Sequence, residues 1–175
     1  MKISNWFLAM TVALLGSAFW WATPAPQADG VVIIPNYQKI ETMADLVKPF
    51  KGKVLYIDVW ATWCGPCRAE MEYAPELKSY IKDKAVEVIY FSVDDARMAP
   101  KWEKIVKGET LAGHHLIANE KLYADLRRLI GVTNEMYIPR YLIIGKDGQL
   151  INNDAKRPSQ KSALYKQIDA ALAAK

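Results

Sequence analysis

Apolar residues are distributed along this chain in two patterns, one typical of buried strands and one typical of helices. Val54–Val59 and Val86–Val93 are nearly continuous apolar runs, which indicate strands buried on both faces of a sheet. Elsewhere apolar residues return every three or four positions, as in helices with one buried stripe. The predicted stripes are Met71, Ala74, Leu77 and Ile81; Trp102, Ile105 and Val106; Leu122, Leu126, Leu129 and Ile130; and Leu164, Ile168 and Leu172.

Shorter β-branched runs and turn residues complete this pattern. Tyr37–Ile40 is expected to pair with Val31–Ile34, and a Lys-Asp-Gly turn predicts a hairpin further along. Asn119 and Ser159 precede helical stripes and are expected to cap those helices. The remaining predicted strands are His114–Ala118, Arg140–Ile144 and Gln149–Asn152. After the first hairpin the order is β-α-β-α-β-α-β-β-α, which predicts an α/β fold with a central mixed sheet and helices on both faces.

The first thirty residues differ from the rest of the chain. Lys2 is followed by no charged residue until Asp29, and Trp6–Ala22 is mostly apolar. This pattern predicts an export signal, either cleaved or retained as a signal anchor. Residues 3–22 are long enough for a span of about 20 residues. We therefore expect a signal peptide or anchor at 1–22, a linker at 23–30 and one domain at 31–175, outside the inner membrane in either case.

Composition excludes several classes of protein. The 175 residues are 51% hydrophobic and 24% charged, which is typical of one globular domain. The 23 basic and 19 acidic residues give a net charge of +4 without a basic block, so nucleic-acid binding is not expected. There are two cysteines, three positions apart, and hence no framework of structural disulfides.

Those two cysteines lie in Trp63-Cys64-Gly65-Pro66-Cys67, between a predicted buried strand and a predicted helix. A thiol at a helix N-terminus has a lowered pKa, because the free N–H groups there favour the thiolate. Cys67 lies one turn further on and is placed to resolve a mixed disulfide on Cys64. Pro66 favours the first helical turn, and Gly65 leaves the approach to Cys64 open.

Two structural alternatives stand beside this redox interpretation: a zinc half-site, or a pair of core cysteines. Zinc needs two further ligands, and the chain has two histidines, His114 and His115. Adjacent residues on a strand point to opposite faces, so we expect one histidine in the core and one in solvent. The sequence therefore predicts no metal site and no organic cofactor, with the Cys64–Cys67 disulfide as the redox group.

The segment from Asp58 to Glu70 (DVWATWCGPCRAE) resembles the active-site segment of the thioredoxin superfamily. Ile138–Gly148 resembles that family's cis-proline strand and the hairpin after it. The broader resemblance, over Phe50–Ile168, is to the TlpA/ResA-like branch of envelope thiol-disulfide oxidoreductases. It implies a thioredoxin-like fold with an N-terminal β extension, and Ala96–Ala118 resembles the helix-strand insertion of this branch. Where the family commonly has proline, this chain has Glu72, and Pro75 is expected to move the helix kink by about one turn.

The resemblance also implies roles for individual residues. Asp58 would exchange a proton with Cys67, and burial in an apolar strand would raise its pKa; the alternative is an exposed strand face. A proline at the start of a strand is trans by default, whereas the resemblance implies a cis Ile138–Pro139 bond beside Cys64. There the backbone of Ile138 would pair with an extended substrate. In thioredoxin a lysine lies opposite this acid, and here Tyr90 and Ser92 occupy the matching strand.

Four other side chains lie near the cysteines in the sequence, and two of them have an alternative interpretation. Trp60 is expected in the core, and Trp63 is expected to face the substrate, with packing under the loop as the alternative. Glu70 matches an acidic position of the family and is a candidate modulator, and a solvated helix face is its alternative. Arg68 is expected on that solvated face, where its charge is screened.

We therefore expect a thiol-disulfide oxidoreductase of the bacterial cell envelope, facing the periplasm. Its catalytic residues would be Cys64, Cys67 and Asp58, its substrates protein disulfides, and its electrons would come from an envelope donor. The resemblance includes proteins of cytochrome c biogenesis. The alternative is a module that binds copper or haem-related cargo through the cysteine pair, although the six methionines form no Met-rich motif.

Overall fold

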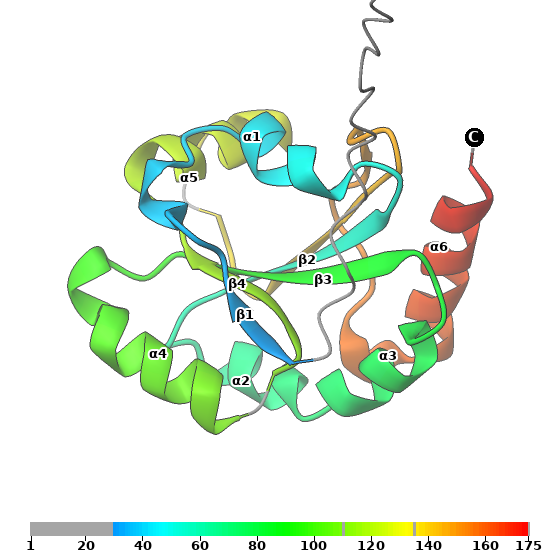
Figure 1. Cartoon of the computed structure of the whole chain (residues 1–175), viewed down its shortest axis with the longest axis horizontal. Helices are drawn as coiled ribbons and strands as arrows, with labels where there is room; N and C mark the ends of the chain where they lie inside the picture. Colours follow the sequence, from blue (N-terminus) through cyan, green and yellow to red (C-terminus); the bar gives the residue numbers. More distant parts are fainter. Residues whose placement is uncertain (1–29, 110, 135, 175) are drawn as a thin grey trace, which may run out of the picture.

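The structure, a computed structural model, describes residues 30–109, 111–134 and 136–174. Within them one six-stranded sheet has the order β1-β4-β3-β2-β5-β6 (Figure 1). β1, β4, β3 and β2 are parallel, while β5 is antiparallel to both β2 and β6. The strands are β1 (Val31–Ile33), β2 (Val54–Trp60), β3 (Val86–Ser92), β4 (Gly113–Ile117), β5 (Arg140–Ile144) and β6 (Leu150–Asn152). The mixed sheet that the sequence predicts is confirmed.

Helices cover both faces of this sheet. In Figure 1, α1 and α5 lie over one face, and α2, α3, α4 and α6 lie over the other. The α-helices are α1 (Met43–Val47), α2 (Gly65–Met71), α3 (Ala74–Ile81), α4 (Ala99–Gly108), α5 (Glu120–Leu129) and α6 (Ser162–Ala173). The 3-10 helices are η1 (Tyr37–Lys39), η2 (Lys48–Phe50), η3 (Ala96–Met98) and η4 (Pro158–Gln160).

The core consists of two apolar layers separated by the sheet. All seven residues of β2 are buried, because β3 and β5 flank it and helices cover both of its faces. Successive side chains of a strand point to opposite faces. Val54, Tyr56 and Trp60 accordingly pack with α2, α3, α4 and α6, whereas Leu55, Ile57 and Val59 pack with α1 and α5.

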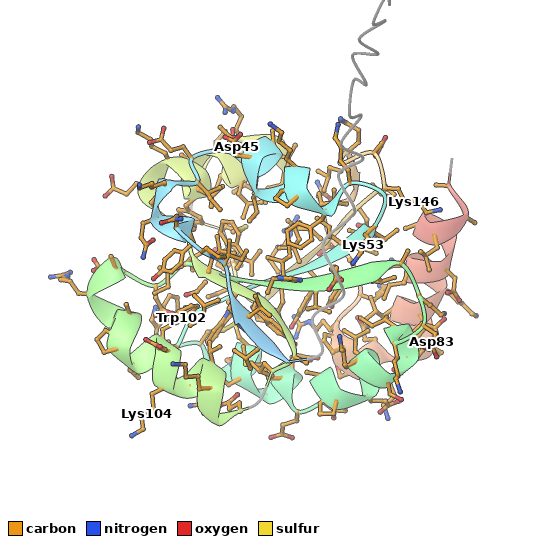
Figure 2. All side chains as sticks on the ribbon, in the orientation of Figure 1. Asp45, Lys53, Asp83, Trp102, Lys104 and Lys146 are labelled. Carbon is orange, nitrogen blue, oxygen red and sulfur yellow. A yellow bond between two sulfur atoms is a disulfide. The ribbon has the colours of Figure 1, made fainter. Side chains whose placement is uncertain are left out.

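The predicted helix-strand insertion is present as η3, α4 and β4. Trp102 is 1% exposed and points from α4 toward the sheet, whereas Lys104 points outward into solvent (Figure 2). The apolar stripe of α4 thus covers the sheet and its polar stripe faces water, as the helical period predicts.

The predicted pairing of Tyr37–Ile40 with the first strand is wrong. Asn36 has a left-handed backbone (φ 54°), and residues 37–39 form η1. Pro35 and Asn36 favour such a turn, which carries the chain away from β1. The partner of β1 is β4, in parallel register with Val31 beside Gly113.

The helix after the cysteines divides into two. α2 ends at Met71 and α3 begins at Ala74, with Pro75 in the first turn of α3. A proline there has no N–H to donate and clashes with a preceding carbonyl, so the first helix cannot continue through it. The prediction that Pro75 moves the interruption of this helix further along the chain is confirmed.

Ser159 does not cap the last helix, contrary to the sequence prediction. It lies in η4, and α6 begins three residues later without a side-chain cap. Its N–H and its hydroxyl are bound to a carboxylate of α2 instead. A serine before an apolar stripe is thus used for a tertiary contact.

No helix in the part of the chain that the structure describes is long and apolar enough to cross a membrane. The predicted signal or anchor at residues 1–22 and nearly all of the predicted linker lie outside the described residues.

Asn119 is predicted to contribute to stability through three hydrogen bonds. Its Oδ1 caps α5 by accepting from the Leu122 N–H (2.9 Å), and its Nδ2 donates to the carbonyls of Gln38 (3.0 Å) and Ile40 (2.8 Å). We expect Asn119→Ala to lower the free energy of unfolding by about 3 kcal/mol, since the cap contributes about 1 kcal/mol and each of the two further bonds a similar amount. Urea unfolding at constant m-value measures this loss.

Asn119→Asp is the matched control. It keeps the capping oxygen and loses the two donated bonds, so its loss of stability is expected between those of wild type and Asn119→Ala. Equal losses in the two variants would show that the cap contributes nothing.

Candidate active site

The two cysteines form a disulfide bond just beyond the end of β2. Cys64 is the N-cap of α2, and its Sγ accepts a hydrogen bond from the Cys67 N–H (3.2 Å). Cys64 is 5% exposed and Cys67 is fully buried. The disulfide therefore has one sulfur near the surface at a helix N-terminus and one in the core, the geometry expected for an attacking and a resolving thiol.

The residues between the cysteines leave this surface open. A side chain added at Gly65 would meet no atom within 4 Å, and Pro66 lies in the first turn of α2. Trp63 is 66% exposed, whereas Trp60 is fully buried. Both tryptophans are thus where the sequence places them, one in solvent beside Cys64 and one in the core.

The turn before Cys64 is held by Asp94, which follows β3. Its carboxylate accepts from the Thr62 N–H (2.8 Å), the Thr62 hydroxyl (2.8 Å) and the Ser92 hydroxyl (2.7 Å). Asp94 is 3% exposed, so these bonds are shielded from water. Sequence reasoning missed this residue, because an aspartate directly after a strand looks like any turn residue.

Two acids near the cysteines in the sequence, Asp58 of β2 and Glu70 of α2, are buried. Asp58 is 2% exposed and Glu70 is 9% exposed. Burial, followed by the charge of Glu70, raises the pKa of Asp58 well above its usual range. The raised pKa that the sequence predicts for a buried Asp58 is confirmed, and its alternative of an exposed strand face is wrong.

Glu70 is held by the C-terminal part of the chain. Its two carboxylate oxygens accept from the Ser159 N–H (3.0 Å) and the Ser159 hydroxyl (2.9 Å) of η4. The alternative of a solvated helix face is therefore wrong for Glu70. Arg68 is on that face, 48% exposed, and binds Glu109 at 2.6 Å.

Tyrosines surround Asp58 where thioredoxin would place a lysine. Tyr90 of β3 and Tyr141 of β5 are its register partners on either side. Tyr141 stacks on Tyr56 with 5.5 Å between ring centroids. Burial, then the charge of Asp58, raises the pKa of Tyr90 and of Tyr141, so both phenols stay protonated. Asp58 therefore lies between two neutral phenols, and neither of these register partners is a cation.

A proline lies directly before β5. The Ile138–Pro139 peptide bond is cis, as the resemblance implies, and Arg140 then pairs with Val59 near the end of β2. Tyr137, just before them, is 91% exposed. Sequence reasoning missed Tyr137, although a tyrosine two residues before this proline offers an aromatic surface on the segment that leads into β5.

The two histidines lie in β4, which β3 separates from β2. His114 and His115 point to opposite faces, but both are buried, so the expected solvent-facing histidine is wrong. His114 lies 3.3 Å from Glu87, and His115 stacks on Tyr90. Burial lowers the pKa of His115 to about 4. Among the described residues, no three or more His, Cys, Asp or Glu side chains are grouped to hold a metal.

Comparison with known proteins connects this geometry to one family. Residues 23–168 match the sequence model of a family described as Redoxin. A protein named thiol-disulfide oxidoreductase ResA, from Bacillus thuringiensis subsp. konkukian (strain 97-27), is 35% identical over 105 residues, which are 60% of this chain and 56% of that protein. The chain thus spans a little over half the length of such curated relatives.

Solved structures show the same fold. A candidate thiol-disulfide oxidoreductase from Bacteroides vulgatus is 33% identical with a TM-score of 0.58, over 74% of this chain and 82% of that one. A candidate thiol:disulfide interchange protein DsbE from Chlorobium tepidum is 28% identical with a TM-score of 0.54, over 72% and 84%. The thioredoxin-like fold is therefore shown.

The buried carboxyl of Asp58 is predicted to make stability depend on pH. Its pKa is raised in the folded state from about 3.9 in the unfolded chain, so it favours folding at low pH and this contribution is lost as pH rises through the folded pKa. Asp58→Asn lacks this loss. Its stability relative to wild type should rise with pH by up to about 1.4 kcal/mol per unit.

Urea unfolding of the disulfide-bonded proteins from pH 4.5 to 8 measures this difference. Asp154→Asn, an exposed carboxyl, is the control and should follow wild type throughout. A difference between Asp58→Asn and wild type that stays constant or falls with pH would contradict the raised pKa.

Proposed function

The chain belongs to the Redoxin family, and on this premise we propose that it is a thiol-disulfide oxidoreductase that reduces protein disulfides. One observation carries the proposal: the Cys64–Cys67 disulfide caps a helix with one sulfur near the surface and the other in the core. A structural disulfide closing only four residues would restrict the unfolded chain little, because its loop is so short. Its position at the end of a buried strand suits exchange chemistry instead.

In the proposed reaction, the reduced protein attacks with the Cys64 thiolate. Its sulfur bonds to one sulfur of the substrate disulfide, and the other substrate sulfur leaves as a thiolate that takes up a proton. Cys67 then loses its proton and attacks the Cys64 sulfur, which releases the second substrate thiolate. The substrate gains two electrons, and the protein returns to the disulfide form described above.

Cys67 needs a proton acceptor when it attacks, and we assign this role to Asp58. Its raised pKa, caused chiefly by burial, allows it to take and return a proton at the pH where thiols react. Glu70 lies near it as a modulator, since its charge contributes to that raised pKa. Ser159 holds the Glu70 carboxylate in place.

The substrate would lie across the surface around Cys64. Trp63 and Gly65 are on one side of the disulfide, where the chain is open. Ile138 and Pro139 would provide the other side, with the backbone of Ile138 pairing with an extended segment. Pro66 is the remaining proposed contact, in the first turn of α2.

We place this reaction in the bacterial cell envelope, facing the periplasm, with an envelope donor that keeps the cysteines reduced. Residues 1–22 support this location by their single lysine and apolar run, whether the segment is cleaved or anchors the protein through residues 3–22. The family match begins at residue 23, which supports a boundary after residue 22. Such a compartment would otherwise oxidise the pair.

The roles of the two cysteines are tested by alkylation and trapping. In the reduced protein near neutral pH, we expect Cys64 to react with iodoacetamide much faster than Cys67, because Cys67 is fully buried. Cys67→Ser should accumulate mixed disulfides with a protein substrate such as insulin, and Cys64→Ser should neither trap nor reduce it. Mass spectrometry of tryptic peptides measures both. Faster labelling of Cys67 would reverse the roles.

The direction of the reaction is tested by the reduction potential. No cationic side chain lies between the cysteines, and the charge of Arg68 is taken up by Glu109, so the Cys64 thiolate is stabilised weakly. We expect a potential below about −180 mV, on the reducing side of isomerase-type proteins. Equilibration with glutathione or dithiothreitol buffers measures it.

Pro66→His is the matched variant for this measurement. An imidazole between the cysteines stabilises the thiolate and should raise the potential. A wild-type value above about −180 mV would make the protein an oxidant or isomerase.

A further inference from the structure

A small polar pocket lies beside Pro139, at the same end of the sheet as the disulfide. Its volume is about 220 Å³. Sites for small molecules are larger, about 300–1,000 Å³, so this pocket fits a single amino-acid side chain. The wall residues that matter here are Pro139, Tyr141, Asp154, Lys156, Arg157 and Gln160.

The pocket carries more positive than negative charge. Lys156 and Arg157 are exposed, and neither forms an ion pair with another described residue. Asp154 contributes the single acidic side chain of the wall, and it is paired with neither cation. Tyr141 is 2% exposed, and its hydroxyl has no hydrogen-bond partner in the described structure. The wall therefore has spare donors and a net charge of +1, from two cations and one anion.

The segment that bears the two cations is fixed to the core through its backbone. The Tyr56 hydroxyl donates to the Lys156 carbonyl (2.9 Å), and the Lys156 N–H donates to Gln167 Oε1 (2.8 Å). The Arg157 N–H donates to Gln160 Oε1 (3.0 Å), and the Gln160 N–H donates to the Arg157 carbonyl (3.0 Å). Little backbone entropy is left to lose when a ligand binds the two side chains.

The pocket is also joined to the redox helix. Ser159, next to Gln160, binds Glu70 of α2 from the same 3-10 helix. Pro139 forms part of the wall and directly follows Ile138, whose backbone is the proposed substrate contact. A polypeptide that pairs with Ile138 would therefore lie next to a wall residue of the pocket.

We propose that this pocket is a subsite for a carboxylate side chain of the substrate, an Asp or Glu within about two residues of its reactive cysteine. This inference rests on the proposed function and adds the class of substrate. An extended segment advances about 3.3 Å per residue, so a neighbouring side chain reaches the pocket while the cysteine meets Cys64. The carboxylate accepts hydrogen bonds from the ammonium of Lys156 and the guanidinium of Arg157.

Peptide disulfides test the subsite without any electron donor. Three short peptides contain one cysteine each and differ only in a Glu, Gln or Lys two positions before it; each is used as its disulfide-linked dimer. The full chain is reduced with dithiothreitol and desalted, and single-turnover rates are measured by acid quench and chromatography. We expect the Glu peptide to react about fivefold faster than the Lys peptide at low salt, with Gln between them. This preference should shrink as added salt screens the charges.

Two double variants test whether Lys156 and Arg157 cause the preference for the Glu peptide. Lys156→Gln with Arg157→Gln should remove the rate ratio between the Glu and Gln peptides. Lys101→Gln with Lys104→Gln removes the same charge from α4, which lies across the helical layer from residues 154–160 (Figure 1), and should keep that ratio. The salt dependence of wild type needs no variant, so it tests the subsite even if a double variant fails to fold.

The outcomes separate the two proposals. If the reduced protein reduces all three peptides at equal rates, the subsite is wrong and the proposed function stands. A preference that survives in the Lys156/Arg157 variant, or that is lost in the Lys101/Lys104 variant, also overturns the subsite. If no peptide is reduced, the proposed function fails and the subsite fails with it.

Discussion

The complete burial of β2 is the constraint on which the rest of this structure depends. A strand without water on either face must satisfy its backbone through neighbouring strands, and β2 does so between β3 and β5. Only where those neighbours end does the chain come to the surface, and Cys64 follows at that point. Asp94 after β3 and Pro139 before β5 reach the same end of the sheet, so the three segments of the site meet there through the order of the strands.

Burial also determines the charges in the site. A carboxyl group inside an apolar layer is more stable protonated, and the phenols beside Asp58 are neutral for the same reason. The Glu70 carboxylate in the same layer accepts two hydrogen bonds from Ser159. The site thus contains two acids of different character within one layer, without a lysine beside Asp58.

The period of the apolar residues predicts most of the fold, because the apolar face of each strand or helix must pack against another element. The runs at β2 and β3, the stripe of α4 and the final hairpin were all predictable in this way. The predicted stripe of α5 holds for Leu122 and Leu126, but Leu129 is 42% exposed. Contacts between distant segments were not predictable: Asp94 binds Thr62 across 32 positions, and Ser159 binds Glu70 across 89. In the sequence, Ser159 looks like a helix cap and Asp94 like a turn residue, because local patterns do not show which distant donor or acceptor is nearby.

The bond between Ser159 and Glu70 has a consequence for the order in which the protein is made. Synthesis proceeds from the N-terminus, so α2 emerges with both cysteines and Glu70 long before residue 159 follows. Until then the Glu70 carboxylate has no donors from η4 and is better solvated than buried. The helix that bears the cysteines therefore reaches its final environment only when the C-terminal segment docks. A newly made chain therefore contains both cysteines before its site is complete.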